Sequence, residues 1–112
     1  MKINLNGAEF EFDIYEAETA DKFERGLTDI QKKCAEAERT QNAADSIVAQ
    51  CNIVFAFIDS LFGEGASNKI FGKSVSFAKC MDVLDEIIDS ADKQTKAMAE
   101  RKNKYAQLRG KV

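Results

Sequence analysis

The sequence contains no histidine, no proline and no tryptophan among its 112 residues. Histidine is the commonest general acid or base near neutral pH and the commonest metal-binding side chain, so its absence excludes serine–histidine catalytic arrangements. Proline removes a backbone donor and disrupts helices, so a chain without it favours long uninterrupted helices. We therefore expect a mainly α-helical protein that is not an enzyme.

Long apolar runs are also missing from the sequence. The longest continuous run, residues 53–58, is far shorter than the roughly 20 residues that cross a bilayer. The first dozen residues lack the apolar region and small-residue cleavage site of a secretory signal. We expect no contact with a membrane and a cytoplasmic location, which is the bacterial host cytoplasm if the chain is encoded by a phage.

The sequence has only three cysteines, and no two of them lie close together in the sequence. Cys34, Cys51 and Cys80 form an odd set without a CxxC motif, and each falls on an apolar helical position. That pattern favours reduced core residues. A site with three cysteine ligands for a metal is the alternative, which the lack of close pairs and of histidine disfavours. We expect neither a metal nor a cofactor.

Charge divides the chain into two parts. Residues 1–92 carry 9 basic and 18 acidic side chains, whereas residues 93–112 carry 7 basic and 1 acidic side chain. An acidic body repels phosphates, so nucleic acid is a disfavoured partner. We divide the chain into a domain of residues 1–92, with a hairpin and a helical core, and a basic helical segment of residues 93–112.

The first residues predict a β-hairpin. Ile3 and Leu5 alternate with polar residues, the pair Asn6-Gly7 suits a type I′ turn, and Phe10 and Phe12 resume the alternation. A lone hairpin is marginal in water, so its apolar face must pack on a helix or on another chain.

Apolar residues at helical spacing then predict three helices, a helical hairpin followed by a long C-terminal helix. The first begins at Thr19, and a break within residues 39–45 separates it from the second, although one continuous helix remains the alternative. Gly63 ends the second helix, a short turn follows at residues 66–71, and Ser74 or Ser76 caps the last helix. The expected core consists of Phe23, Leu27, Ile30, Val48, Cys51, Phe55, Ile58, Leu84 and Ile88.

No motif carries chemistry. Gly72-Lys73-Ser74 matches the end of a phosphate-binding loop, but the required earlier glycine is replaced by Ser67. Gly63, Gly65 and Gly72 instead predict a tight structural turn between two helices. The acidic group Asp82, Asp85, Glu86 and Asp89 lies opposite the apolar stripe of its helix and predicts a solvated face.

The basic segment is the candidate binding site for a partner. We place there Lys93, Lys96, Arg101, Lys102, Lys104, Tyr105 and Arg109. The segment can contact phosphates, contact an acidic protein surface such as the body of a second copy, or simply end in solvent. Charge complementarity favours self-association into a homo-oligomer.

The layout resembles that of a known family. A short acidic chain with an N-terminal hairpin, the strings FIDSLFGEG at residues 57–65 and KIFG at residues 69–72, and a lysine-rich end is similar to small tail assembly chaperones of tailed phages and prophages of Gram-positive bacteria. The resemblance implies that the protein binds the long helical tape measure protein and recruits tail tube subunits. The resemblance does not assign a binding role to any particular residue of this sequence.

Two other functions remain open. One is a structural component that stays in the virion, in the tail or at head completion. The other is a helical regulatory or DNA-associated protein that uses its basic C-terminal segment.

Overall fold

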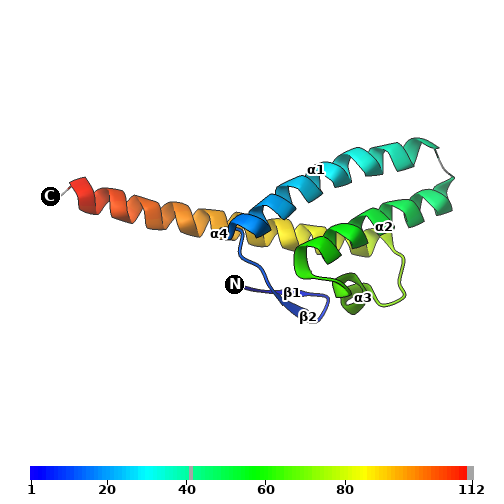
Figure 1. Ribbon diagram of the computed structural model, residues 1–112, viewed down its shortest axis with the longest axis horizontal. Helices are drawn as coiled ribbons and strands as arrows, with labels where there is room; N and C mark the ends of the chain where they lie inside the picture. Colours follow the sequence, from blue (N-terminus) through cyan, green and yellow to red (C-terminus); the bar gives the residue numbers. More distant parts are fainter. Residues whose placement is uncertain (41, 111–112) are drawn as a thin grey trace.

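Two short strands and four helices make up the part of the chain that the computed structural model describes, residues 1–40 and 42–110 (Figure 1). In chain order they are β1 (Lys2–Leu5), β2 (Ala8–Glu11), α1 (Ala17–Thr40), α2 (Ala43–Phe62), α3 (Ala66–Phe71) and α4 (Phe77–Gly110). The protein is 76% helical, and an antiparallel hairpin precedes the helices. The prediction of a mainly α protein with an N-terminal hairpin is confirmed.

The hairpin turns at Asn6 and Gly7, the pair that predicted it. Both residues have positive φ, at 54° and 89°, and the Gly7 N–H donates to Asn4 Oδ1 at 2.9 Å. Ile3 faces Phe10 and Leu5 faces Ala8 across the two strands. The apolar face of the hairpin lies against the helices, where Leu5 and Phe12 are fully buried.

Helices α1 and α2 run antiparallel and form a helical hairpin (Figure 1). The chain therefore breaks in the predicted region. The Asn42 side chain caps α2 by accepting from the Asp45 N–H at 2.9 Å. The expected cap at Thr19 is wrong, because α1 already begins at Ala17 and Thr19 lies within its first turn.

The segment after α2 contains a helix that the sequence did not predict. Residues 66–71, expected as a turn, form α3, which packs against α2 and buries Ile70 and Phe71. Ser67 allows this helix, because its N–H and hydroxyl both donate to the Asp59 carboxylate, at 2.8 and 3.1 Å. The predicted count of three helices is therefore one too few.

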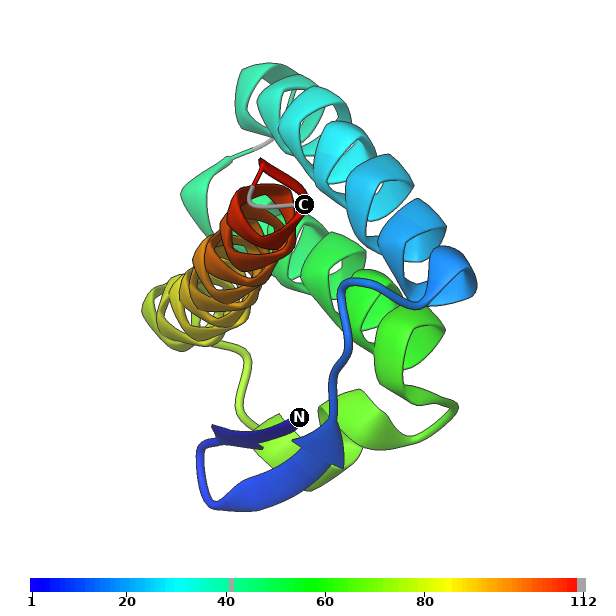
Figure 2. The same ribbon diagram turned by 90° about the vertical axis from the view of Figure 1, so that its left-hand side faces the viewer.

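Helix α4 is the longest element and extends beyond the rest of the molecule (Figure 1), and Figure 2 looks along it from its C-terminal end. Ser76 caps it, because its Oγ accepts from the Lys79 N–H at 3.3 Å. From Thr95 to the last described side chain, at residue 108, every side chain is exposed except Met98, which is partly buried. We call residues 95–110 the extension. It makes the molecule 64 Å long, and the radius of gyration is 17.0 Å against about 13 Å for a compact chain of this length.

The core lies where the hairpin, α2, α3 and the first half of α4 meet. Ile30, Cys51, Ile58 and Leu84 are buried as expected, and Phe23, Leu27 and Phe55 pack against them partly buried. Val48 and Ile88 are wrong predictions, with 47% and 40% of their surfaces exposed. They belong to the same helical stripes as the core residues, but no neighbouring element covers them fully.

Among the described helices, α2 alone is long and apolar enough to cross a membrane by length and composition, with a mean hydropathy of 1.4. The central helix of a water-soluble protein meets the same criterion, and α2 packs against α1, α3 and α4. The criterion is therefore weak evidence for a membrane span.

Candidate partner-binding surface

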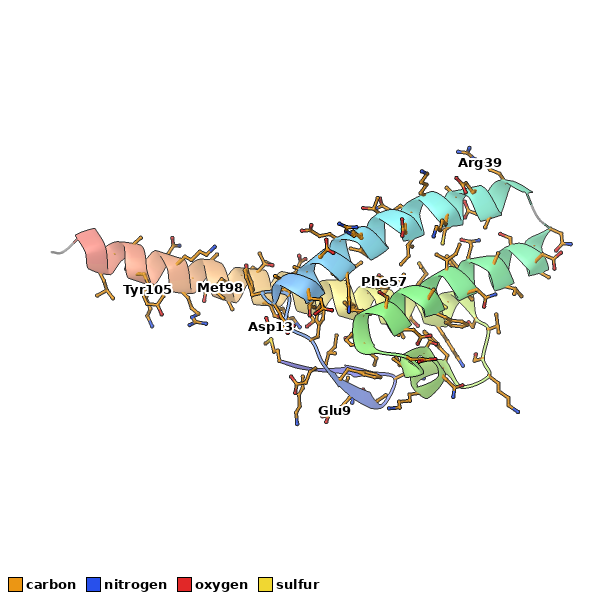
Figure 3. The ribbon with its side chains drawn as sticks, viewed as in Figure 1. Glu9, Asp13, Arg39, Phe57, Met98 and Tyr105 are labelled. Carbon is orange, nitrogen blue, oxygen red and sulfur yellow. The ribbon has the colours of Figure 1, made fainter. Side chains whose placement is uncertain are left out.

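The extension carries an apolar stripe that has no partner within the chain. Inside the body, Leu84, Ile87, Ala91 and Gln94 form the buried stripe of α4. The same spacing of three and four residues continues through Met98, Arg101, Tyr105 and Leu108. Tyr105 and Leu108 are 58% and 59% exposed, and Figure 3 shows Met98 and Tyr105 on the projecting part of the helix. The helix face that is buried in the body is therefore exposed to solvent in the extension.

Most of the predicted cationic residues line the extension without ion pairs. Lys93 precedes it and pairs with Asp89 at 3.0 Å, and this hydrogen bond raises the pKa of the Lys93 ammonium group. Among the residues that the structure describes, Lys96, Arg101, Lys102 and Lys104 pair with no carboxylate. The Arg109 side chain and Lys111 lie outside the described residues. Four exposed cations are thus free to meet acidic groups of another molecule.

One buried glutamine marks where the body ends and the extension begins. Gln94 Oε1 accepts from the Ile14 N–H, and Gln94 Nε2 donates to the Phe12 carbonyl, both at 2.9 Å. The same Nε2 donates to Ser90 Oγ at 3.2 Å. The side chain, 7% exposed, therefore joins α4 to the segment that follows the hairpin. The helix crosses the expected boundary at residue 92 without interruption, and its last buried residue is Gln94.

A groove lies between α1 and α4, next to the start of the extension. It has a volume of about 520 Å³ and is lined by Ile14, Tyr15, Ala20, Phe23, Glu24, Leu27, Ile88, Ala91, Asp92 and Thr95. The two charged side chains in this lining, Glu24 and Asp92, are both acidic, and the structure shows no ion pair for either among the described residues. We call it the α1/α4 groove. It is an apolar groove with negative charge at its rim.

A second cleft, of about 430 Å³, lies between α1 and α2. Its floor is formed by Gly26, Ile30, Ile53 and Phe57, and its rim carries both signs of charge, including the Arg25–Asp21 ion pair at 2.8 Å. Because a mixed rim attracts neither sign, this cleft is the weaker candidate for a charged partner.

The three predicted turn glycines all have positive φ, at 107° for Gly63, 87° for Gly65 and 59° for Gly72. Gly63 and Gly72 end α2 and α3, and their N–H groups donate to the carbonyls of Asp59 and Asn68. They shape the reversal between α2 and α4, and they lie away from the extension (Figure 1).

The cysteines come from three different helices and influence one another. Burial is the main cause that raises the pKa of the Cys80 thiol on α4 to about 12, and the Cys51 thiol on α2 adds to the rise. Burial and the nearby Glu38 raise the pKa of Cys34 on α1. All three are free thiols, and among the described residues no group of histidine, cysteine or acidic side chains is arranged to hold a metal ion.

Comparison with known proteins places the sequence in a family. A model of a family of unknown function, DUF6673, matches residues 6–111. The chain belongs to this family. No curated protein and no solved structure matches it. The DUF6673 family carries no described function, so the function must be argued from the geometry of this chain.

Three residues that matter for this DUF6673 fold escaped the sequence analysis. Gly26 and Gln94 lie within stretches of helical periodicity, and Asp59 lies within an apolar stretch. From the sequence alone, each looks like an ordinary surface residue. A glycine in the middle of a helix was the one available signal, because it costs helix stability unless close packing requires it. The α1/α4 groove was not predictable, since it depends on how two helices diverge.

Proposed function

We propose that this protein binds an amphipathic helical segment of another protein, with the extension and the α1/α4 groove as the contact surface. One observation carries the proposal. The stripe of α4 that is buried in the body continues beyond Gln94, where the chain is still helical but the stripe is exposed to solvent. An isolated helix of this length is marginal in water without a packing partner. A second apolar surface is needed to bury it.

The physical fit is that of helix-in-groove recognition, in which an apolar face enters an apolar groove and charges at the rim set the orientation. A long helical client can contact both surfaces, because the extension leads out of the groove. Its acidic residues would meet the extension, and its basic residues would meet Glu24 and Asp92.

The resemblance to tail assembly chaperones names the class of client that we propose. A tape measure protein is a long helix with exposed apolar stripes, and a small chaperone that covers it must later be displaced by tail tube subunits. Weak single contacts repeated along the client suit that role, because several weak contacts together bind firmly yet can be released one by one. The proposal includes a cytoplasmic location in the host cell.

The proposal is tested by co-expression with the longest helical protein encoded beside this gene. We expect the client to stay soluble only when this chain is present. Reversal of Lys96, Arg101, Lys102 and Lys104 to glutamate should weaken binding about tenfold or more, because exposed ion pairs contribute roughly 0.2–1 kcal/mol each.

The matched control reverses four exposed lysines of the body, Lys32, Lys33, Lys69 and Lys73. It makes the same change in net charge and should leave binding intact. A client that precipitates equally with and without the chain would refute the chaperone role. Stoichiometric presence of the chain in purified virions would favour the structural alternative.

A further inference from the structure

Two surfaces of the chain are complementary but cannot meet within one copy. The extension offers exposed Tyr105 and Leu108 among cations, and the α1/α4 groove offers an apolar lining with two carboxylates. The groove centre lies near residues 91 and 92 of α4, so Tyr105 and Leu108 are about 22 Å farther along the same straight helix, at about 1.5 Å per residue. A copy cannot fold its own extension back into its own groove while α4 stays helical.

We propose that two copies form a two-fold dimer in which the extension of each occupies the α1/α4 groove of the other. This goes beyond the proposed function, because it concerns the chain alone and requires no client. Each copy supplies a groove and the helix that fills the other groove, so the interface uses the same surfaces on both copies.

The positions of the residues along α4 give the geometry. Ile88, Ala91 and Thr95 line the groove, and the same row continues through Met98, Lys102 and Tyr105 at spacings of three and four residues. An antiparallel partner laid along this row with the two-fold axis near Met98 brings Tyr105 beside Ala91 and Leu108 beside Ile88 of the other copy. Ile88, which is 40% exposed, would thereby gain an apolar neighbour.

Charge selects this arrangement over one in which the two extensions pair along their full length. Full-length pairing would crowd Lys96, Arg101, Lys102 and Lys104 against the cations of the other copy, and the only acidic residue in the segment is Glu100. Docking in the groove instead brings Lys102 and Lys104 to Glu24 and Asp92. The exposed acids that precede the groove on α4, Asp82, Asp85, Glu86 and Asp89, add to the attraction of a basic helix.

The consequence for the proposed function is competition for one surface. A client helix that binds the groove must displace the extension of the second copy, so the dimer protects both apolar surfaces until a client is present. Failure of the two proposals can be distinguished, because the dimer is measured without a client.

The first test is sedimentation equilibrium of the full chain at micromolar concentration. We expect a species of about 25 kDa, twice the 12.5 kDa chain mass. The double variant Glu24→Lys/Asp92→Lys should raise the dissociation constant at least tenfold, and the added changes Lys102→Glu/Lys104→Glu should restore the dimer. The control Glu9→Lys/Glu38→Lys changes the same charge at two exposed residues outside the groove and should leave the dimer intact. Circular dichroism confirms that each variant is folded.

The second test is disulfide cross-linking under mild oxidation. The double variant Ile88→Cys/Leu108→Cys should yield a covalent dimer, and the single variant Leu108→Cys should not. Cross-linking of the single variant would show that the extensions pair with each other, which overturns the proposal. A monomer at high micromolar concentration, or a charge exchange that fails to restore association, overturns it as well.

Discussion

At the scale of single residues, Gly26 and Phe57 determine how closely α1 and α2 pack. A methyl group at Gly26 would overlap the Phe57 ring, which is 5% exposed and lies between the two helices (Figure 3). Phe57 also contacts Phe23, at 6.5 Å between ring centroids, and Phe23 contacts Phe12 at 5.9 Å. The glycine thus admits a ring that links the helical hairpin to the segment after β2.

We predict that Gly26→Ala destabilises the protein although alanine is the better helix former. Overpacking a core costs about 1–3 kcal/mol, and the gain in helix propensity is about 1 kcal/mol, so the net loss should reach up to about 2 kcal/mol. Urea unfolding measures it. In the double variant Gly26→Ala/Phe57→Leu the two losses should be less than additive, because the smaller side chain makes room for the methyl group. An additive result would contradict the close contact.

The thiol pair Cys51 and Cys80 makes stability depend on alkaline pH. The folded chain raises the pKa of Cys80 from 9.0 to about 12, so the folded state retains a proton that the unfolded state releases. This stabilisation is complete below pH 9 and is lost as the pH rises toward 12. The unfolding free energy should therefore decline from pH 9 upward. Cys80→Ala should be less stable at pH 7 and should show a shallower decline, and equal slopes for both proteins would contradict the buried position.

At the scale of elements, the hairpin depends on the helices. A two-stranded hairpin is marginal by itself. Here Gln94 bonds the backbone that follows β2, and Asn6 Nδ2 donates to the Ile70 carbonyl at 2.8 Å. These bonds come from residues 64 and 80 or more positions away in the sequence. The hairpin is therefore held in place by long-range contacts.

We predict that Gln94→Leu loosens the hairpin selectively. The substitution leaves the Ile14 N–H and the Phe12 carbonyl without partners, at about 1–3 kcal/mol for each buried group. Hydrogen exchange should become faster in β1 and β2 and stay slow in α2. Gln107→Leu makes the same change at an exposed position of α4 and should have no effect on the hairpin. Uniform loss of protection in all elements would mean that the bond supports the whole fold instead.

Local signals in the sequence were sufficient for some elements. Asn6-Gly7 predicted the hairpin turn because few other pairs adopt positive φ twice, and Gly63 predicted the end of α2 for the same reason. Helix α3 escaped because a helix of six residues has no periodic pattern to read, and its start depends on a bond between Ser67 and Asp59. Val48 and Ile88 were placed in the core because periodicity identifies a helix face but not how far a neighbouring helix reaches along it. The α1/α4 groove exists for that same geometric reason.

At the scale of the whole molecule, charge and shape act together. The acidic body and the basic extension lie along one axis 64 Å long, so the protein has opposite charge at its two ends. Such a molecule attracts acidic partners at one end and basic partners, or a reversed copy of itself, at the other. Because the charged groups are exposed, added salt should weaken both kinds of association.

The most direct measurement of the central claim is photo-cross-linking from the extension. A benzoylphenylalanine placed at Tyr105 should capture a second protein chain, and the product mass identifies it as another copy or as a co-expressed helical client. The control places the same group at Val75, an apolar residue that is 47% exposed but lies between α3 and α4, away from the extension. We expect cross-links at position 105 and none at position 75. Capture at position 75 alone, or at neither position, would contradict the claim that the extension holds another protein.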